Sequence, residues 1–328
     1  MLTILTAAEA PQEFETWYAS VDLTAIESHP MYGAYGRTYY QAVFDAEKTD
    51  TSFAVLIDGA PLLLVPCSVG GGTLDYWGSP ILIFPRAGLS AEVEAAAISH
   101  ASDQFERVAQ QYAVNRTIIL DNSSNGTLSP IGEQCLNRKF LPETTLTALC
   151  DLTEGEISMR RGLRKSYKSL LNWGKRNLSL GYVGLENPDR ALFLRFQEFH
   201  RTVAGRTTRP QSSWDASFDW IVSGHGELVL GFLPNDELVA GTMVYDGGER
   251  TLYGTGVYDR ERFDKPMAHW CLWVAMLRAA ERGKKTFELG QLPFSGRASD
   301  KEVSIGYFKR GFSTSIATSI VWTLQTQA

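Results

Sequence analysis

A lysine near the end of the chain combines the residue type and the setting that acyl-transfer chemistry needs. Lys309 belongs to Gly306-Tyr-Phe-Lys-Arg-Gly-Phe312, with Phe308 and Phe312 close by. These aromatic neighbours predict a partly apolar cleft, in which an ammonium group acts more strongly than on a wet surface. A fixed cation there would stabilise the tetrahedral oxyanion of amide formation. Lys309 and the adjacent Phe308 are therefore candidate catalytic residues; the alternative is a surface lysine on a terminal hairpin.

A carboxylate precedes this lysine on a strand-like segment that ends in a glycine. Glu288 belongs to Phe287-Glu-Leu-Gly290. A carboxylate close to a bound amine accepts its proton or orients it for attack. Glu288 is therefore another candidate catalytic residue. The alternative is a structural carboxylate that pairs with a nearby cation.

Two arginines enclose a pair of threonines in the middle of the chain. Arg206 and Arg209 belong to Gly205-Arg-Thr-Thr-Arg-Pro210. Guanidinium groups bind phosphate oxygens in a bidentate manner, so this loop is a candidate phosphate clamp. His200, at the end of the helix expected before the loop, is a further candidate ligand-binding residue. Salt bridges at a helix end and a structural histidine are the alternatives.

One basic cluster stands out in a chain whose net charge is −6. Arg161, Arg164, Lys165 and Lys168 follow one another at spacings of three and four, which predicts one shared helical face. Like charges at this density repel one another, so an anionic ligand such as a tRNA acceptor stem, CoA or a nucleotide sugar would stabilise them. Arg164 and Lys168 are candidate phosphate-binding residues. The alternative is a solvated helix face.

Two aromatic residues precede a glycine in the first half of the chain. Tyr76 and Trp77 stand before Gly78 and are candidates to line an acceptor cleft. The alternative is that both belong to the core, where such residues are common.

The composition excludes several other classes of protein. Hydrophobic residues make up 44% and charged residues 21% of the 328 residues, values typical of a soluble globular chain. The net charge of −6 argues against a general nucleic-acid binder. The sequence contains no apolar run of about 18 residues, so no transmembrane helix is expected. Residues 1–15 lack the basic start of a signal peptide.

Motifs for metal, serine and nucleotide chemistry are absent from the sequence. The five histidines form no HxxxH or HxH pattern, so no metal site is predicted. There is no GxSxG, and Gly70-Gly71-Gly72 is not followed by the Gly-Lys-Ser/Thr of a P-loop. The cysteines are far apart and are expected to be reduced, mostly buried thiols of a cytoplasmic protein. They are Cys67, Cys135, Cys150 and Cys271.

The elements that must position these residues follow from periodicity and turn signals. In the first half, residues 51–57 and 61–66 predict a β-hairpin around Asp58-Gly59. A helix is expected from Ala91 to Tyr112, and a strand over residues 116–120. In the second half, Thr153 is expected to cap one helix over residues 157–176. Further helices are expected over residues 188–203, 212–223 and 268–282, and strands over residues 227–233, 237–245, 251–258 and 285–289.

Four places in the second half together carry a family resemblance. They are Leu163-Arg-Lys-Ser-Tyr-Lys168, the segment 199–209 before the three-stranded meander, Lys265-Pro-Met-Ala-His-Trp270 at the start of the buried helix, and Phe287-Glu-Leu-Gly290 followed by Phe308-Lys309. In order and spacing they resemble the FemABX peptidyltransferases, which are built from GNAT-like domains. The resemblance covers about residues 157–312.

This resemblance implies an α/β (α+β) fold of two tandem GNAT-like domains with a cleft. The domains are predicted over residues 1–150 and 151–328, with a boundary between about residues 125 and 155. The implied reaction transfers an acyl or aminoacyl group to an amine on an amino sugar, a nucleotide-linked precursor or an amino acid. Arg37 lies where the family has a phosphate-contacting cation, and the site residues of the second half lie in the C-terminal domain.

Two departures from the family pattern bear on the donor. CoA-dependent GNAT proteins carry a glycine-containing turn that holds the pyrophosphate at a helix N-terminus. The matching segment here, Asp259 to Ala268, contains no glycine. The resemblance therefore leaves acyl-CoA, an acyl carrier protein and aminoacyl-tRNA open as donors. In addition, Glu288 stands where the family strand often ends in Asp.

The sequence supports two function hypotheses. The first is an amide-forming transferase without a tightly bound cofactor. Its transfer is expected to be direct, because no cysteine or serine is placed as a nucleophile. The second is a non-catalytic ligand-binding module on the same fold, because fold alone does not establish activity.

Overall fold

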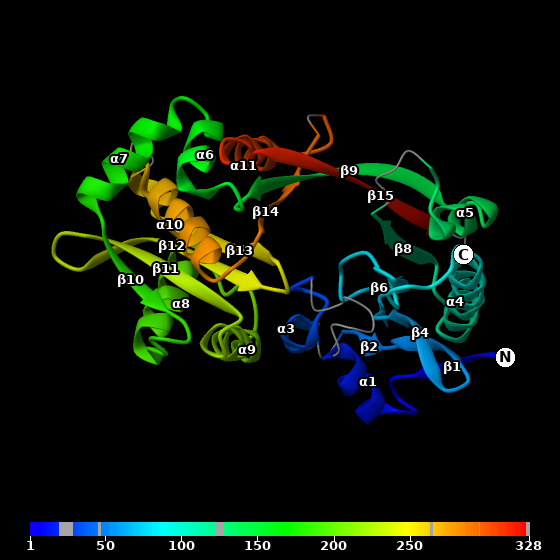
Figure 1. Ribbon diagram of the computed structural model, residues 1–328. Coiled ribbons are helices and arrows are strands. Elements are labelled where there is room, and N and C mark those ends of the chain that lie inside the picture. The colour runs from blue at the N-terminus through cyan, green and yellow to red at the C-terminus, as the bar shows by residue number, and fades with distance from the viewer. Residues whose placement is uncertain (20–28, 45–46, 123–126, 263–264, 295, 326–328) are drawn as a thin grey trace. The chain divides into compact units, whose positions relative to one another are not determined.

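The computed structural model describes residues 1–19, 29–44, 47–122, 127–262, 265–294 and 296–325. The chain forms two compact units (Figure 1). Unit 1 contains Met1–Thr145 and Thr318–Ala328, and unit 2 contains Leu146–Ala317. Both units mix helices and strands, which confirms the predicted α/β class. The candidate residues of the second half of the sequence all lie in unit 2.

Unit 2 is built on a sheet with the strand order β10-β11-β12-β13-β14-β9. Neighbouring strands are antiparallel except β13 and β14, which are parallel. The strands are β10 (Ser179–Val183), β11 (Gly226–Leu233), β12 (Glu237–Asp246), β13 (Arg250–Tyr258), β14 (Thr286–Leu292) and β9 (Leu141–Asp151). The helices are α6 (Gly155–Gly162), α7 (Tyr167–Asn177), α8 (Arg190–Ala204), α9 (Gln211–Val222), α10 (Met267–Glu281) and α11 (Asp300–Arg310). In Figure 1, α7 and α10 cover one face of this sheet, and α8 and α9 the other.

The predicted meander and the buried helix after it are confirmed. Strands β11, β12 and β13 pair in succession. The first turn holds Asn235 and Asp236 at φ 77° and 62°, a left-handed conformation that these two residue types adopt more easily than most. Helix α10 is apolar on most sides, and its Leu272 and Trp273 are fully buried. It therefore forms the centre of the unit 2 core.

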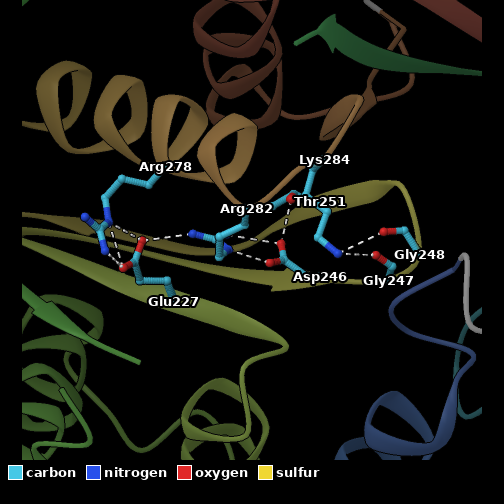
Figure 2. Close-up of polar contacts among 8 residues, drawn as sticks. All are labelled: Glu227, Asp246, Gly247, Gly248, Thr251, Arg278, Arg282 and Lys284. Carbon is cyan, nitrogen blue, oxygen red and sulfur yellow. Dashed lines mark hydrogen bonds and ion pairs between the residues drawn. The ribbon is translucent and has the colours of Figure 1, made fainter. Parts of the chain in front are cut away.

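Charged side chains attach α10 to the edge of the meander (Figure 2). Arg278 Nε donates to both carboxylate oxygens of Glu227 at 2.8 Å. Arg282 donates to Asp246 at 2.7 Å and to Glu227 at 3.1 Å, and the Thr251 hydroxyl donates to Asp246 at 2.6 Å. Glu227 and Asp246 are only 5% and 3% exposed, so they depend on the arginines of α10 for neutralisation.

The prediction of one helix over residues 157–176 is wrong. Two helices, α6 and α7, occur there, and residue Leu163 (φ −60°, ψ 145°) takes the chain out of the first. The backbone N–H of Arg164 donates to Gly311 O at 3.0 Å, so a tertiary contact replaces the bond of a continuous helix. Thr153 is not the cap, because Glu154 occupies the N-cap position and Thr153 bonds to Asp151 instead.

Unit 1 holds two sheets within its described residues. One has the order β1-β3-β4-β7, and in the other β15-β8-β6-β5-β2 are neighbours. The strands are β1 (Leu2–Thr6), β2 (Thr49–Asp50), β3 (Phe53–Ile57), β4 (Ala60–Val65), β5 (Ser68–Gly70), β6 (Thr73–Asp75), β7 (Phe84–Pro85), β8 (Arg116–Asp121) and β15 (Ser315–Gln325). The helices are α1 (Pro11–Tyr18), α3 (Ala34–Phe44), α4 (Ala91–Gln111) and α5 (Pro130–Asn137).

Three elements predicted for the first half are confirmed. Strands β3 and β4 pair as an antiparallel hairpin around Asp58 and Gly59. Helix α4 and strand β8 follow at the expected positions. Strand β15 begins in unit 2 and ends in unit 1, where Ile320–Gln325 pair with β8 and Trp322 is 2% exposed in the core.

Candidate active site

The candidate site lies where two parallel strands of unit 2 separate. Strands β13 and β14 pair only over Arg250–Leu252 and Thr286–Glu288. Beyond these residues β13 continues to pair with β12, and β14 with β9. The register of β14 also shifts between Glu288 and Gly290. Glu288 is therefore the last residue of β14 that pairs with β13, and after it the two strands no longer pair with each other.

Lys309 reaches this point from α11. A Cβ atom on Gly290 would lie 2.9 Å from Lys309 Nζ, and Gly290 has a φ of +91°. The positive φ favours a glycine here, and the distance places the ammonium group of Lys309 against the β14 backbone. Burial lowers the pKa of Lys309, and the charge of Glu288 acts in the opposite direction. Lys309 is partly buried and forms no ion pair with the described residues.

The carboxylate of Glu288 is held by an arginine. Arg250 Nη1 donates to Glu288 Oε2 at 2.9 Å, and the two side chains are 34% and 23% exposed. The structure therefore brings Lys309 and Glu288 into one charged group and adds Arg250 to it. Sequence reasoning missed Arg250. Its signal is weak, because Arg250 follows a Gly-Gly-Glu turn and becomes a neighbour of Glu288 only through the parallel pairing of β13 and β14.

An aromatic cluster stands behind Lys309. Phe308 contacts the rings of Tyr167, His269 and Phe312, with centroid distances of 6.3, 5.1 and 5.3 Å. His269 lies edge-on to Tyr167 at 4.6 Å. Burial, together with a smaller effect of the Arg164 charge, lowers the pKa of His269 to about 4, although a backbone contact with Pro266 acts in the opposite direction. Phe308 therefore belongs to the apolar wall that was expected beside Lys309, and Tyr167 and His269 are members that sequence reasoning missed.

This arrangement has the parts that acyl transfer to an amine requires. The ammonium group of Lys309 forms no ion pair with the described residues, so it can stabilise a developing oxyanion. Glu288 offers a carboxylate that can accept or orient a proton. Beyond Glu288, β13 and β14 no longer pair with each other, so their facing edges diverge at the site.

The loop between α8 and α9 forms a second, separate feature of unit 2. A pocket of about 410 Å³ is lined there by both threonines of the loop, Arg206, Arg209 and His200. Arg209 stacks on Trp214, with Cζ 3.6 Å from the ring centroid, and His200 lies edge-on to the same ring at 5.1 Å. Burial and the Arg209 charge lower the pKa of His200. Arg206 is exposed and has no ion-pair partner in the described part of the chain.

The structure does not bring this loop together with Lys309. Helices α8 and α9 lie on the face of the sheet opposite to α10, whereas Phe308 of α11 contacts His269 of α10 (Figure 1).

The basic cluster is divided by the break between α6 and α7. Arg164 and Lys165 lie in the link, so the prediction of one shared helical face is wrong. Arg164 turns toward α11, with Cζ 3.5 Å from the ring centroid of Tyr307 and Nη2 donating to Tyr307 O at 2.7 Å. Lys165 and Lys168 are exposed and have no ion-pair partner among the described residues.

The candidates of unit 1 are mostly interior. Tyr76 and Trp77 are 0% and 3% exposed, and Tyr76 stacks on Tyr32 at 4.4 Å. Both side chains therefore belong to the interior of unit 1. The Arg37 side chain is 12% exposed, pairs with Glu15 and lies 4.0 Å from Asp50.

No helix among the described residues is long and apolar enough to cross a bilayer. No cluster of three or more potential metal-ligating side chains occurs in the same residues. Of the glycine-free segment 259–268, residues Phe263 and Asp264 lie outside the described part.

Comparisons with known proteins show the fold. No family model and no curated protein sequence matches the chain. FemX is similar over 99% of this chain and 97% of its own, with a TM-score of 0.68 and 12% identity. A tandem GNAT protein from the clavulanic acid biosynthesis pathway matches over 100% and 99%, with a TM-score of 0.58 and 13% identity. The C-terminal domain of a putative lysylphosphatidylglycerol synthetase from Agrobacterium fabrum matches over 89% and 92%, with a TM-score of 0.58 and 14% identity. The chain therefore has a FemABX/GNAT-like fold of two tandem GNAT-like domains.

Proposed function

We propose that this protein is an N-acyl or aminoacyl transferase that forms an amide bond on an amine acceptor. The observation that carries the proposal is the half-buried Lys309 ammonium group, which lies beside Glu288 where β13 and β14 separate. The fold neighbours support transfer chemistry in general, and the site supports the amide-forming kind.

In the proposed reaction, the acceptor amine attacks the donor carbonyl carbon. The carbonyl oxygen becomes an oxyanion, and the Lys309 ammonium group stabilises it. The amine must lose a proton, and Glu288, held by Arg250, accepts or orients it. The tetrahedral intermediate then expels the donor's thiol or hydroxyl group, which takes up a proton. No covalent enzyme intermediate is needed.

The donor in this proposal carries phosphate. Arg206 and Arg209 on the α8–α9 side of the sheet, and Lys168 with its exposed basic neighbours on the α7 side, are two separate candidate sites for phosphate groups of acyl-CoA, an acyl carrier protein or aminoacyl-tRNA. The glycine-free segment 259–268 favours a donor other than acetyl-CoA, because it lacks the usual pyrophosphate-binding turn. The acceptor would be an amino sugar, a nucleotide-linked precursor or an amino acid.

The deciding experiment uses the purified full chain with acetyl-CoA or with aminoacyl-tRNA and a set of amine acceptors, and detects amide products by mass spectrometry. With the active pair, Lys309→Ala should lower kcat by about 10²–10³ because it removes one oxyanion donor. Ligand affinity should change little, since the interaction with the oxyanion forms only in the transition state. The melting temperature should also change little, because a lysine in a cleft supports little of the core. Lys309→Arg should rescue activity only in part.

The same experiment separates the two hypotheses. A Lys309→Ala variant that keeps most of the wild-type turnover would contradict the assigned role of Lys309. Binding of a donor without any amide product would favour the non-catalytic binding module.

A further inference from the structure

The carbonyl end of α11 is held by side chains from a distant part of unit 2. The last carbonyl groups of a helix have no partner within the helix. Arg164 Nη2 donates to Tyr307 O at 2.7 Å. The Tyr167 hydroxyl donates to Phe308 O at 3.1 Å, and the backbone N–H of Gly311 also donates to this oxygen, at 3.0 Å. These two carbonyl groups belong to the residues immediately before Lys309.

Arg164 also contacts the chain on the other side of Lys309. Its backbone N–H donates to Gly311 O at 3.0 Å, and its Nη1 donates to the Tyr167 hydroxyl at 3.0 Å. The guanidinium group covers the ring of Tyr307. A single residue of the link between α6 and α7 therefore contacts residues 307 and 311, which flank Lys309.

Tyr167 is placed to complete this contact. It is 5% exposed and packs against His269 and Phe312, with centroid distances of 4.6 and 4.9 Å. A Cβ atom on Gly311 would lie 2.2 Å from the Tyr167 ring. The close approach of this ring to the α11 backbone thus requires the glycine at 311.

The rest of α11 packs on β14, with Gly306 against Pro293, but buries little of its surface. Gly306 is its only buried residue. Its first turn is closed by a capping box, in which Ser299 and Glu302 bond to each other's backbone N–H groups. The last turn, which carries Lys309, is held by the ring contacts of Phe308 and by the hydrogen bonds from Arg164 and Tyr167 to its carbonyl groups.

We propose that Arg164 and Tyr167 are positioning residues that hold the last turn of α11 so that Lys309 Nζ lies against Gly290 beside Glu288. The inference rests on the proposed function of Lys309, and it gives Arg164 a role different from phosphate binding. Its consequence for catalysis is geometric, because a displacement of about 1 Å in a reacting group can cost about 10²-fold in rate.

Two conservative variants test the proposal. Tyr167→Phe removes only the hydroxyl group. Arg164→Lys keeps the charge, but one ammonium group cannot replace both the Nη1 and the Nη2 contacts. Arg310→Lys is the matched control, because Arg310 is an exposed arginine of α11 itself with no ion-pair partner among the described residues. If one test variant fails to fold, the other still decides.

The first readout does not depend on activity. Lysine amines of the full chain are reductively methylated with ¹³C, and the Lys309 resonance is assigned by its loss in Lys309→Arg. The charged groups that face Lys309 are Glu288 and, through it, Arg250. In Tyr167→Phe and Arg164→Lys, the Lys309 titration should move toward that of ordinary lysines, since the amine leaves its buried position. In Arg310→Lys it should stay at the wild-type value.

The second readout is the amide-forming reaction. Both test variants should lower kcat by about tenfold or more with KM nearly unchanged, because they disturb a group that acts in the transition state. If Lys309→Ala abolishes turnover while both variants keep the wild-type kcat and Lys309 titration, the positioning role is wrong. If Lys309→Ala is fully active, the proposed function fails, and the Lys309 titration alone then decides whether the two residues position it.

Discussion

Replacing Arg282 by an apolar residue of similar volume should destabilise unit 2, because the charge of Arg282 is lost. The variant Arg282→Met keeps much of the volume and removes the guanidinium group. Asp246, whose side chain is 1% exposed, would then retain the Thr251 hydroxyl but lose its cation. Glu227 would still be paired with Arg278. The variant therefore leaves one buried carboxylate without a neutralising partner.

The expected magnitude follows from this burial. Removing one partner of a buried ion pair costs about 3–5 kcal/mol, because the remaining charge is desolvated and uncompensated. Adding Asp246→Asn removes that charge and should recover more than half of the loss. The matched control is Lys285→Met, which breaks the pair with Glu249. These side chains are 57% and 68% exposed, so its cost should be about 0–1 kcal/mol.

Urea unfolding at pH 7, followed by circular dichroism, measures these free energies for the three variants and the wild type. Hydrogen exchange on peptides of β12 would assign the loss to unit 2. Equal and small losses for Arg282→Met and Lys285→Met would refute the reasoning. So would a double variant as unstable as Arg282→Met alone, because the cost would then not come from the charge of Asp246.

Three further predictions concern ligand binding and pH. Arg206→Glu should weaken binding of CoA or pyrophosphate, and wild-type binding should fall as salt rises; unchanged affinity in titration calorimetry would remove the phosphate clamp. His269, with its pKa lowered to about 4 from 6.5, is neutral in the native state while the unfolded chain takes up a proton. Stability should therefore be full above about pH 6.5 and fall as the pH drops toward 4, and His269→Phe should lack this part of the loss, up to about 3 kcal/mol in urea unfolding. Because burial lowers the pKa of Lys309, kcat should decline on the alkaline side at a lower pH than for an ordinary lysine, and Lys309→Arg should shift that decline upward; a pH–rate profile that the substitution leaves unchanged would speak against Lys309.

Elements with strong local signals could be predicted from the sequence. The Asp58-Gly59 hairpin, helix α4 and the meander depend on turn residues and on periodicity, which lie within a short window. The charged group around Lys309 could be predicted only in part. Glu288 and Phe308 belong to short segments that the sequence analysis singled out, Phe287–Gly290 and Gly306–Phe312. Arg250 comes next to Glu288 only through the parallel pairing of β13 and β14, which no local pattern specifies.

The misassigned helix shows where local reasoning stops. Residues 157–176 contain good helix formers, and the basic spacing supports one continuous helix. The break at Leu163 arises because Arg164 bonds to Gly311, about 150 residues later in the chain. A tertiary contact therefore overrides local propensity. The domain limits 1–150 and 151–328 stay a prediction, whereas the compact units place residues 318–328 with unit 1.

The return of β15 to unit 1 has a consequence for synthesis on the ribosome. Translation adds about 5–20 residues per second, and domains generally fold in order from the N-terminus. Here β8 can pair with Ile320–Gln325, and Trp322 can enter the core, only after all of unit 2 has been made. Unit 1 would then stay incomplete while unit 2 is being translated. A fragment that stops at Thr145 would present the unpaired edge of β8 to other chains, and such an exposed edge promotes aggregation.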